Sequence, residues 1–174
     1  MTRIRKITVV ALFAACAASA ALFVIPNPFL PTVPFTLQVF VVLLAGIVLE
    51  PSLAVGSMVT YLAVGALGVP VYAGATGGLA HLFGPTGGFL LSYPLAAAVT
   101  SFATGARPNI ERAFLAAMGG LAVIYVLGFF GLHVFAGLPL DFKTALPLAT
   151  FVPWDIAKAA LAAIVGSRLK RQFR

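Results

Sequence analysis

Long apolar segments alternate along this sequence with short groups of proline, glycine and charged residues. Neither residues 7–49 nor residues 51–106 contain a single Asp, Glu, Lys or Arg. A helix that crosses the ~30 Å hydrocarbon core of a membrane needs roughly 20 apolar residues, and groups of proline and glycine end such helices. The pattern predicts an all-α integral membrane protein with six transmembrane helices, at about residues 7–25, 35–49, 52–69, 89–103, 113–136 and 153–169.

The connections between these segments are marked by helix-breaking residues. Four prolines between Pro26 and Pro34 close the first helix, Glu50-Pro51 separates the second from the third, and Pro70 ends the third. A glycine-rich stretch then leads to the fourth helix, which contains Pro94. Because the connections are short, no room remains for a soluble domain. We expect a single membrane domain over residues 1–174.

The N-terminal segment resembles a secretory signal, because three bases precede an apolar stretch that contains small residues. The apolar run nevertheless continues past Cys16 and covers the 19 residues from Ile7 to Ile25. The apolar cores of signal sequences are only about 7–15 residues long. The length therefore predicts a first helix that is retained as a membrane span.

Composition and charge agree with a membrane protein, since 61% of the 174 residues are hydrophobic and 9% are charged, against about 25% charged in an average soluble domain. The net charge of +7 does not indicate nucleic acid as a partner, because the bases flank apolar segments, as topology signals do. They predict a multi-pass membrane protein with both termini in the cytoplasm and only Lys143 outside. The cytoplasmic bases would be Arg3, Arg5, Lys6, Arg107, Arg112, Arg168, Lys170, Arg171 and Arg174.

Two opposite charges, Asp155 and Lys158, lie three residues apart near the outer end of the last apolar segment. This spacing places both on one helix face, and a charge inside the bilayer costs at least ~2.5 kcal/mol. Such residues usually face a cavity or a partner. The pair predicts a ligand site that offers an acceptor at Asp155 and a cation at Lys158; the alternative is an ion pair that only locks the bundle. The neighbouring Trp154 is expected to be an interface anchor rather than a ligand contact.

Two further stretches reach the same outer face. Irregular backbone beside a membrane must be buried or line a cavity, so the glycine-rich loop is expected to form a lid in which Tyr72 and Thr76 offer polar contacts, or else a compact turn. Thr36 and Gln38 stand at the outer end of the second helix, where they either reach the cavity or bond between helices. His81 is expected to be a hydrogen-bonding loop residue rather than a metal ligand, because no second ligand has the required spacing.

Small residues at helical spacing follow the first helix, with Ala11, Ala15 and Ser19 on one ridge. Such a ridge either packs inside the bundle or docks onto another membrane protein. The sequence contains no nucleotide-binding loop, no zinc-protease motif and no Ser-His-acid set. We therefore expect no enzyme and no ATP hydrolysis by this chain, so uphill transport would need a partner or an ion gradient. An intramembrane enzyme with Asp155 as base and a purely structural subunit are the alternatives to a transport protein.

Five motifs follow one another along the chain: VPFTLQ at Val33–Gln38, LGVPVYAG at Leu67–Gly74, Gly77-Gly78, GPTGG at Gly84–Gly88, and Asp155-x-x-Lys158. In this order they resemble the BioY family, the biotin-capturing S components of energy-coupling factor vitamin transporters. The resemblance implies a six-helix bundle in the bacterial cytoplasmic membrane that binds biotin from outside, between the loop after the third helix and the outer ends of the fourth and sixth. Another small vitamin is the alternative ligand. The resemblance implies no cofactor; the partners would be a transmembrane coupling subunit, docked on Ala11 and Ala15, and two cytoplasmic ATPases.

The same resemblance suggests roles for the remaining candidates. Asp155, Lys158 and Gln38 match polar positions of the family, and Tyr72 and Phe89 suit the thiophane ring and valeryl chain of biotin. Two positions depart from the family pattern: Thr76 stands where members often carry Asn, and Phe89-Leu90 stand where some carry Tyr-Arg. Without that Arg, either Lys158 and backbone N–H groups hold the carboxylate of biotin, or the carboxylate stays near water.

Overall fold

Helices make up nearly all of the regular structure in the computed structural model, which describes residues 2–170. In that range the β-structure is limited to two isolated bridges, Ile25 with Phe35 and Tyr72 with Thr76. The all-α prediction is confirmed. The elements are α1 (Arg3–Ala21), α2 (Gln38–Val48), α3 (Pro51–Ala66), the 3-10 helix η1 (Leu79–Phe83), α4 (Gly87–Thr104), α5 (Ile110–Ala136), α6 (Phe142–Ala149) and α7 (Val152–Leu169).

The first helix is shifted toward the N-terminus relative to the expected span. It begins at Arg3 because Thr2 caps it, accepting a hydrogen bond from the Arg5 N–H. It ends at Ala21, and the apolar residues that follow are extended: Ile25 and Phe35 exchange backbone hydrogen bonds of 3.0 and 2.9 Å. That bridge holds together the ends of the proline-rich connection, and α2 accordingly starts at Gln38. Apolar character alone did not distinguish these extended residues from helix.

A short helix that the sequence pattern did not predict precedes α7. In α6 the Asp141 side chain accepts from the Thr144 N–H at 2.9 Å, and the axis turns by 47° into α7. Among residues 2–170, α1, α4 and α5 are each long and apolar enough to cross a membrane, and the bent α6–α7 pair is a fourth candidate. The apolar helices α2 and α3 are shorter, with 11 and 16 residues.

Close contacts between small residues hold the bundle together. A Cβ added at Gly88 of α4 would lie 2.6 Å from the Gly131 Cα of α5, so the two backbones touch. Gly46 of α2 and Gly120 of α5 approach Thr100 of α4 in the same way. Small residues allow such approach in membrane bundles. The helix α2 lies in the middle, in contact with α1, α3, α4, α5 and α7, and its first residue, Gln38, is buried.

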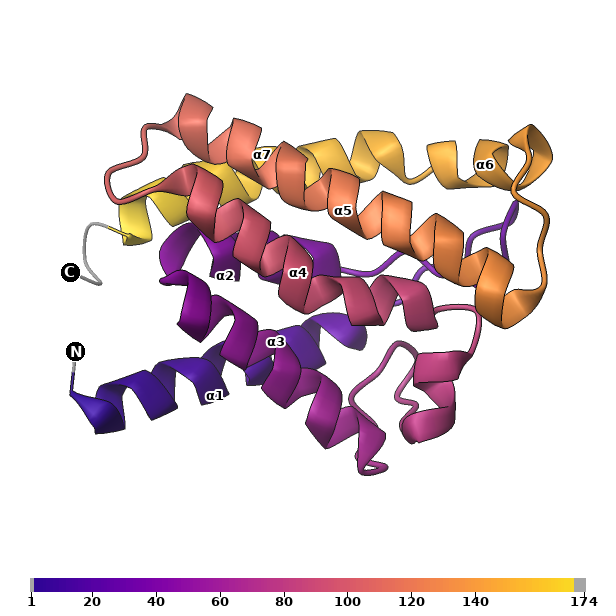
Figure 1. Cartoon of the computed structure of the whole chain (residues 1–174), viewed down its shortest axis with the longest axis horizontal. Helices are drawn as coiled ribbons and strands as arrows, with labels where there is room; N and C mark the ends of the chain where they lie inside the picture. Colours follow the sequence, from indigo (N-terminus) through magenta and orange to yellow (C-terminus); the bar gives the residue numbers. More distant parts are fainter. Residues whose placement is uncertain (1, 171–174) are drawn as a thin grey trace.

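The two ends of the molecule differ in character (Figure 1). The start of α1, the α4–α5 connection and the end of α7 lie together at one end, and the described bases Arg3, Arg5, Lys6, Arg107, Arg112, Arg168 and Lys170 belong to these segments. Arg171 and Arg174 lie outside the described residues. At the opposite end the long connections after α1, α3 and α5 gather around the ends of the helices.

Candidate functional site

A cavity of about 260 Å³ lies where these long connections meet the helix ends. Its walls come from the proline-rich connection, the start of α2, the loop between α3 and α4, the first turns of α4 and the start of α7. Every residue that the sequence proposed for ligand binding lines it, although these residues come from four separate segments. They are Gln38, Tyr72, Thr76, Phe89, Asp155 and Lys158.

Asp155 and Lys158 form an ion pair in the wall of the cavity, with Lys158 Nζ 2.8 Å from Asp155 Oδ1. The ammonium also donates to the Thr36 carbonyl at 2.7 Å, and the second carboxylate oxygen accepts from the Tyr125 hydroxyl at 2.8 Å. Asp155 is buried, with 4% of its surface exposed. Asp155 and Lys158 therefore bond to each other, as expected for an ion pair that locks the bundle. They also line the cavity, as expected for a ligand site.

Tyr125 is a contributor that the sequence analysis missed. It stands within α5 and reaches Asp155 from outside the cavity lining. A buried tyrosine usually directs its hydroxyl to a polar partner, so a tyrosine inside an apolar segment was the available signal. The contact fixes the orientation of the carboxylate and leaves its other oxygen to Lys158.

Gln38 belongs to a chain of hydrogen bonds that links α2 to the loop after α3. Its amide donates to the Tyr61 hydroxyl, which in turn donates to the Val71 carbonyl at 3.1 Å. The Thr36 hydroxyl donates to Gln38 Oε1 at 3.1 Å. The helix-to-helix bonding considered for Gln38 is therefore present, through Tyr61 of α3, and both Thr36 and Gln38 still line the cavity.

The loop after α3 turns back on itself at Tyr72 and Thr76, whose backbones exchange hydrogen bonds of 2.9 and 3.3 Å. Gly74 and Ala75 have φ values of 73° and 56°, and this left-handed backbone reverses the chain. The Tyr72 hydroxyl donates to the Leu62 carbonyl at 2.6 Å, and burial raises its pKa. Tyr72 thus offers the cavity its ring rather than a free hydroxyl. The Thr76 hydroxyl donates to the Ala73 carbonyl at 3.0 Å.

Aromatic rings form the apolar part of the wall. Phe89 and Tyr93 stand one turn apart on α4 and line the cavity together with Phe151. The Phe151 ring packs on Phe35, with ring centroids 4.3 Å apart. Of these aromatic residues, only Phe89 was predicted from the sequence. The four-residue spacing on one helix face was the available signal for Tyr93, whereas Phe151 takes its place from the unpredicted break between α6 and α7.

His81 also lines the cavity, from η1. Its backbone N–H donates to the Gly78 carbonyl at 3.2 Å, but within residues 2–170 its ring nitrogens have no hydrogen-bond partner, contrary to the expectation of a hydrogen-bonding side chain. The imidazole instead packs edge-on against the Tyr72 ring, with centroids 6.1 Å apart. The same described range holds no cluster of three metal-ligating side chains.

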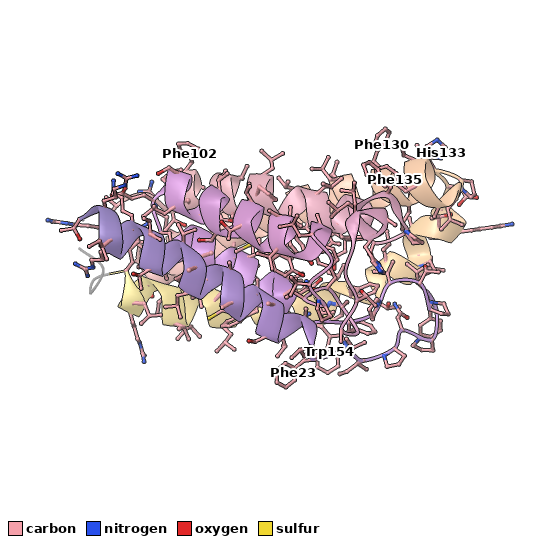
Figure 2. The ribbon with its side chains drawn as sticks, turned by 90° about the horizontal axis from the view of Figure 1, so that it is seen from below. Phe23, Phe102, Phe130, His133, Phe135 and Trp154 are labelled. Atoms are coloured by element: carbon pink, nitrogen blue, oxygen red, sulfur yellow. The ribbon has the colours of Figure 1, made fainter. Side chains whose placement is uncertain are left out.

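Trp154 and the α1 ridge face outward. Trp154 is 65% exposed and lies beside Phe23 on the outer surface (Figure 2), which suits the predicted interface anchor. Ala11 and Ala15 are also exposed. Packing inside the bundle is therefore the wrong interpretation for these two alanines. The buried face of α1 carries other residues, namely Val9, Phe13, Ala14, Ala17, Ala20 and Ala21.

Comparisons with known proteins converge on one family. The model of the BioY family matches residues 1–174. The chain is 39% identical over 166 residues to the probable biotin transporter BioY of Pyrococcus horikoshii, covering 95% of this chain and 96% of that protein. It is 36% identical over 141 residues to the biotin transporter BioY of Thermotoga maritima, covering 80% and 82%. The crystal structure of the S-component for biotin from an ECF-type ABC transporter matches with a TM-score of 0.88 and 26% identity, over 98% of this chain and 95% of that one.

Proposed function

This chain belongs to the BioY family, and from that premise we propose that it captures biotin in the cavity between α2, α4 and α7. Biotin uptake is the function that the similar transporters and the matching S-component support. One observation supports this location most strongly: six candidate residues from four segments converge on one cavity. The protein is a transport component and not an enzyme, so binding and release are its whole chemistry.

The chemistry of the cavity suits the parts of biotin. The ureido ring carries two N–H donors and one carbonyl acceptor, which match Asp155 and the ammonium of Lys158. Tyr72, Phe89 and Phe151 supply aromatic surface for the thiophane ring and the valeryl chain. Small-molecule sites commonly combine apolar walls with a few placed polar groups. Thr76 and Gln38 would complete the polar set.

The proposed topology has six spans, with both termini in the cytoplasm and the cavity open to the outside. Apart from Lys143 and Lys158, the described bases belong to segments at the end opposite the cavity, and cytoplasmic segments are enriched in Lys and Arg. The helices α2 and α3 would cross as short spans inside the bundle, extended by the connections at the cavity end. The chain would then reside in the cytoplasmic membrane of a bacterium.

Energy for uptake would come from partner subunits, because the sequence contains no nucleotide-binding loop. We assign a transmembrane coupling subunit and two cytoplasmic ATPases to this role. The exposed Ala11 and Ala15 on α1 would form the contact with the coupling subunit, since small residues allow close approach of a second helix.

Equilibrium binding of labelled biotin to the purified chain in detergent tests the proposal. The unmodified chain should bind biotin and release it chemically intact. Asp155→Asn and Lys158→Ala should each weaken binding at least tenfold, because each leaves a buried polar partner unpaired, a loss of about 1.5–3 kcal/mol. Lys143→Ala, on exposed α6 surface, is the matched control and should bind normally. Absence of binding by the unmodified, folded chain would reject the function.

A further inference from the structure

The proposed ligand is an anion, and the cavity has little net charge to meet it. Lys158 is paired with Asp155 at 2.8 Å and also bonded to the Thr36 carbonyl, so two of its three N–H groups are engaged. The ion pair contributes no net charge to the wall. Among the described residues that line the cavity, the other titratable side chains are Tyr72, Tyr93 and His81. A tyrosine hydroxyl is neutral near pH 7, which leaves the imidazole.

The surroundings of His81 hold its ring in place and leave its nitrogens available. The ring makes a T-shaped contact with the Tyr72 ring, and Tyr72 is itself anchored to α3 by the hydrogen bond from its hydroxyl to the Leu62 carbonyl. Two residues further along η1, Phe83 packs against Phe135 with ring centroids 5.9 Å apart. Neither contact uses an imidazole nitrogen. The side chain is half-buried, so a ligand in the cavity can reach it.

We propose that His81 binds the carboxylate end of the captured ligand as an imidazolium, so that capture tightens in acidic surroundings. This inference rests on the proposed function, because it requires an anionic ligand in this cavity. It identifies a residue that determines which end of the ligand faces the loop. The ureido end would then lie toward Asp155 and Lys158, and the acid end toward η1.

The expected pH dependence follows from the charge of histidine. A histidine side chain ordinarily gains its proton between about pH 8 and 5, whereas an alkyl carboxylate resembles Glu, with a pKa of about 4.3, and stays ionised in that range. A contact that favours the charged imidazole about tenfold strengthens binding about fivefold between pH 7.5 and pH 5.5. The affinity for the ligand rises as the pH falls, because a protonated imidazole attracts the carboxylate and this contact exists only in the complex.

A comparison of biotin with its neutral amide separates the effect of His81 from that of other titratable groups nearby. The elements α3 and α4 pack against η1 and bring Tyr61 and Tyr93, and the loop brings Tyr72; tyrosines do not change charge between about pH 5.5 and 7.5. The helix α5 also contacts η1, through Phe135 against Phe83, and carries Tyr125 and His133; the variant His133→Gln tests the contribution of His133. Asp155 and Lys158 face the cavity from α7. Their proposed contact is the ureido group, which biotin and its neutral amide share, so any effect of theirs appears with both ligands.

The experiment measures the dissociation constants of biotin and of biotinamide at pH 5.5, 6.5 and 7.5. It uses the purified full chain, the variants His81→Gln and His81→Lys, and the control His133→Gln. His133 is a matched control because it lies on the outer surface of α5 (Figure 2), with its Nδ1 2.9 Å from the Leu138 carbonyl oxygen. Binding of biotinamide reports that each variant is folded.

The unmodified chain and His133→Gln should bind biotin about fivefold more tightly at pH 5.5 than at pH 7.5, with no such change for biotinamide. His81→Gln should lose the rise, and His81→Lys should bind biotin tightly at all three pH values. A rise shared by biotinamide, a rise that persists in His81→Gln, a flat profile in the unmodified chain, or loss of biotinamide binding in both His81 variants would overturn the proposal. Failure of the unmodified chain to bind either ligand would instead reject the proposed function.

Discussion

In the part of the bundle away from the cavity, Ser57 and Thr104 donate their buried hydroxyls to the backbone of their own helix, to the Leu53 carbonyl at 2.8 Å and the Thr100 carbonyl at 2.6 Å. Ser101 is an exception there, since its hydroxyl donates to the Leu49 carbonyl at 2.7 Å. Around the cavity, polar side chains bond between elements instead, as Tyr125 does with Asp155 and Lys158 with the Thr36 carbonyl. The first arrangement lets helices pack through small apolar contacts. The second makes the geometry of the site depend on several segments at once.

This difference predicts that substitutions in the two regions affect different properties. A residue that fills a helix contact should change the stability of the fold. A residue that orients a cavity side chain should change ligand affinity with little effect on stability. The following variants test this separation in order of decreasing expected effect.

The largest effect is expected for Gly120→Ala in α5. A Cβ at this position would lie 2.1 Å from Thr100 Oγ1 and 2.9 Å from the Ala96 carbonyl oxygen, so α4 and α5 must move apart. Overpacking of this kind costs about 1–3 kcal/mol, and the melting temperature in detergent should fall. Gly119→Ala is the matched control, because its nearest contact would be an ordinary 3.6 Å. Equal melting temperatures for the two variants would contradict the packing described for this contact.

Tyr125→Phe should affect the cavity rather than the bundle. The variant keeps the ring and removes the hydroxyl that donates to Asp155 Oδ2. A hydrogen bond to a charged group contributes about 1.5–3 kcal/mol, and we expect biotin affinity to fall about tenfold because the carboxylate loses its fixed orientation. Binding and thermal unfolding are measured on the same samples. A loss of stability without a loss of affinity would show that Tyr125 supports the fold and not the site.

The smallest effect is expected for Trp154→Ala, although its side chain is adjacent to Asp155 in sequence. Trp154 is 65% exposed and lines an outer groove with Phe23 and Ile25 instead of the cavity. Affinity for biotin should change less than twofold. A large loss of affinity would indicate that the ligand binds in the outer groove beside α7 and would contradict binding in the cavity.

The sequence was informative where a residue type is costly in a membrane. The charges at Asp155 and Lys158, the amide at Gln38 and the irregular glycine-rich loop all violate the apolar pattern, and the structure brings all of them to one cavity. The resemblance to the BioY family added Phe89, which the apolar pattern does not distinguish from its neighbours.

Other features depend on tertiary contacts that no local pattern records. The end of α1 at Ala21 is set by the pairing of Ile25 with Phe35, although the apolar run continues. The availability of His81 depends on how η1 packs, which sequence spacing does not reveal. Such positions are decided by partners distant in the chain, so propensity and periodicity could not locate them.

The most direct test of the account is a structure of the purified chain determined with biotin bound. We expect the ureido ring within hydrogen-bonding distance of Asp155 and Lys158, with Tyr72 and Phe89 against the body of the ligand. Biotin bound elsewhere, with Asp155 and Lys158 bonded as they are here and making no contact with it, would contradict the account.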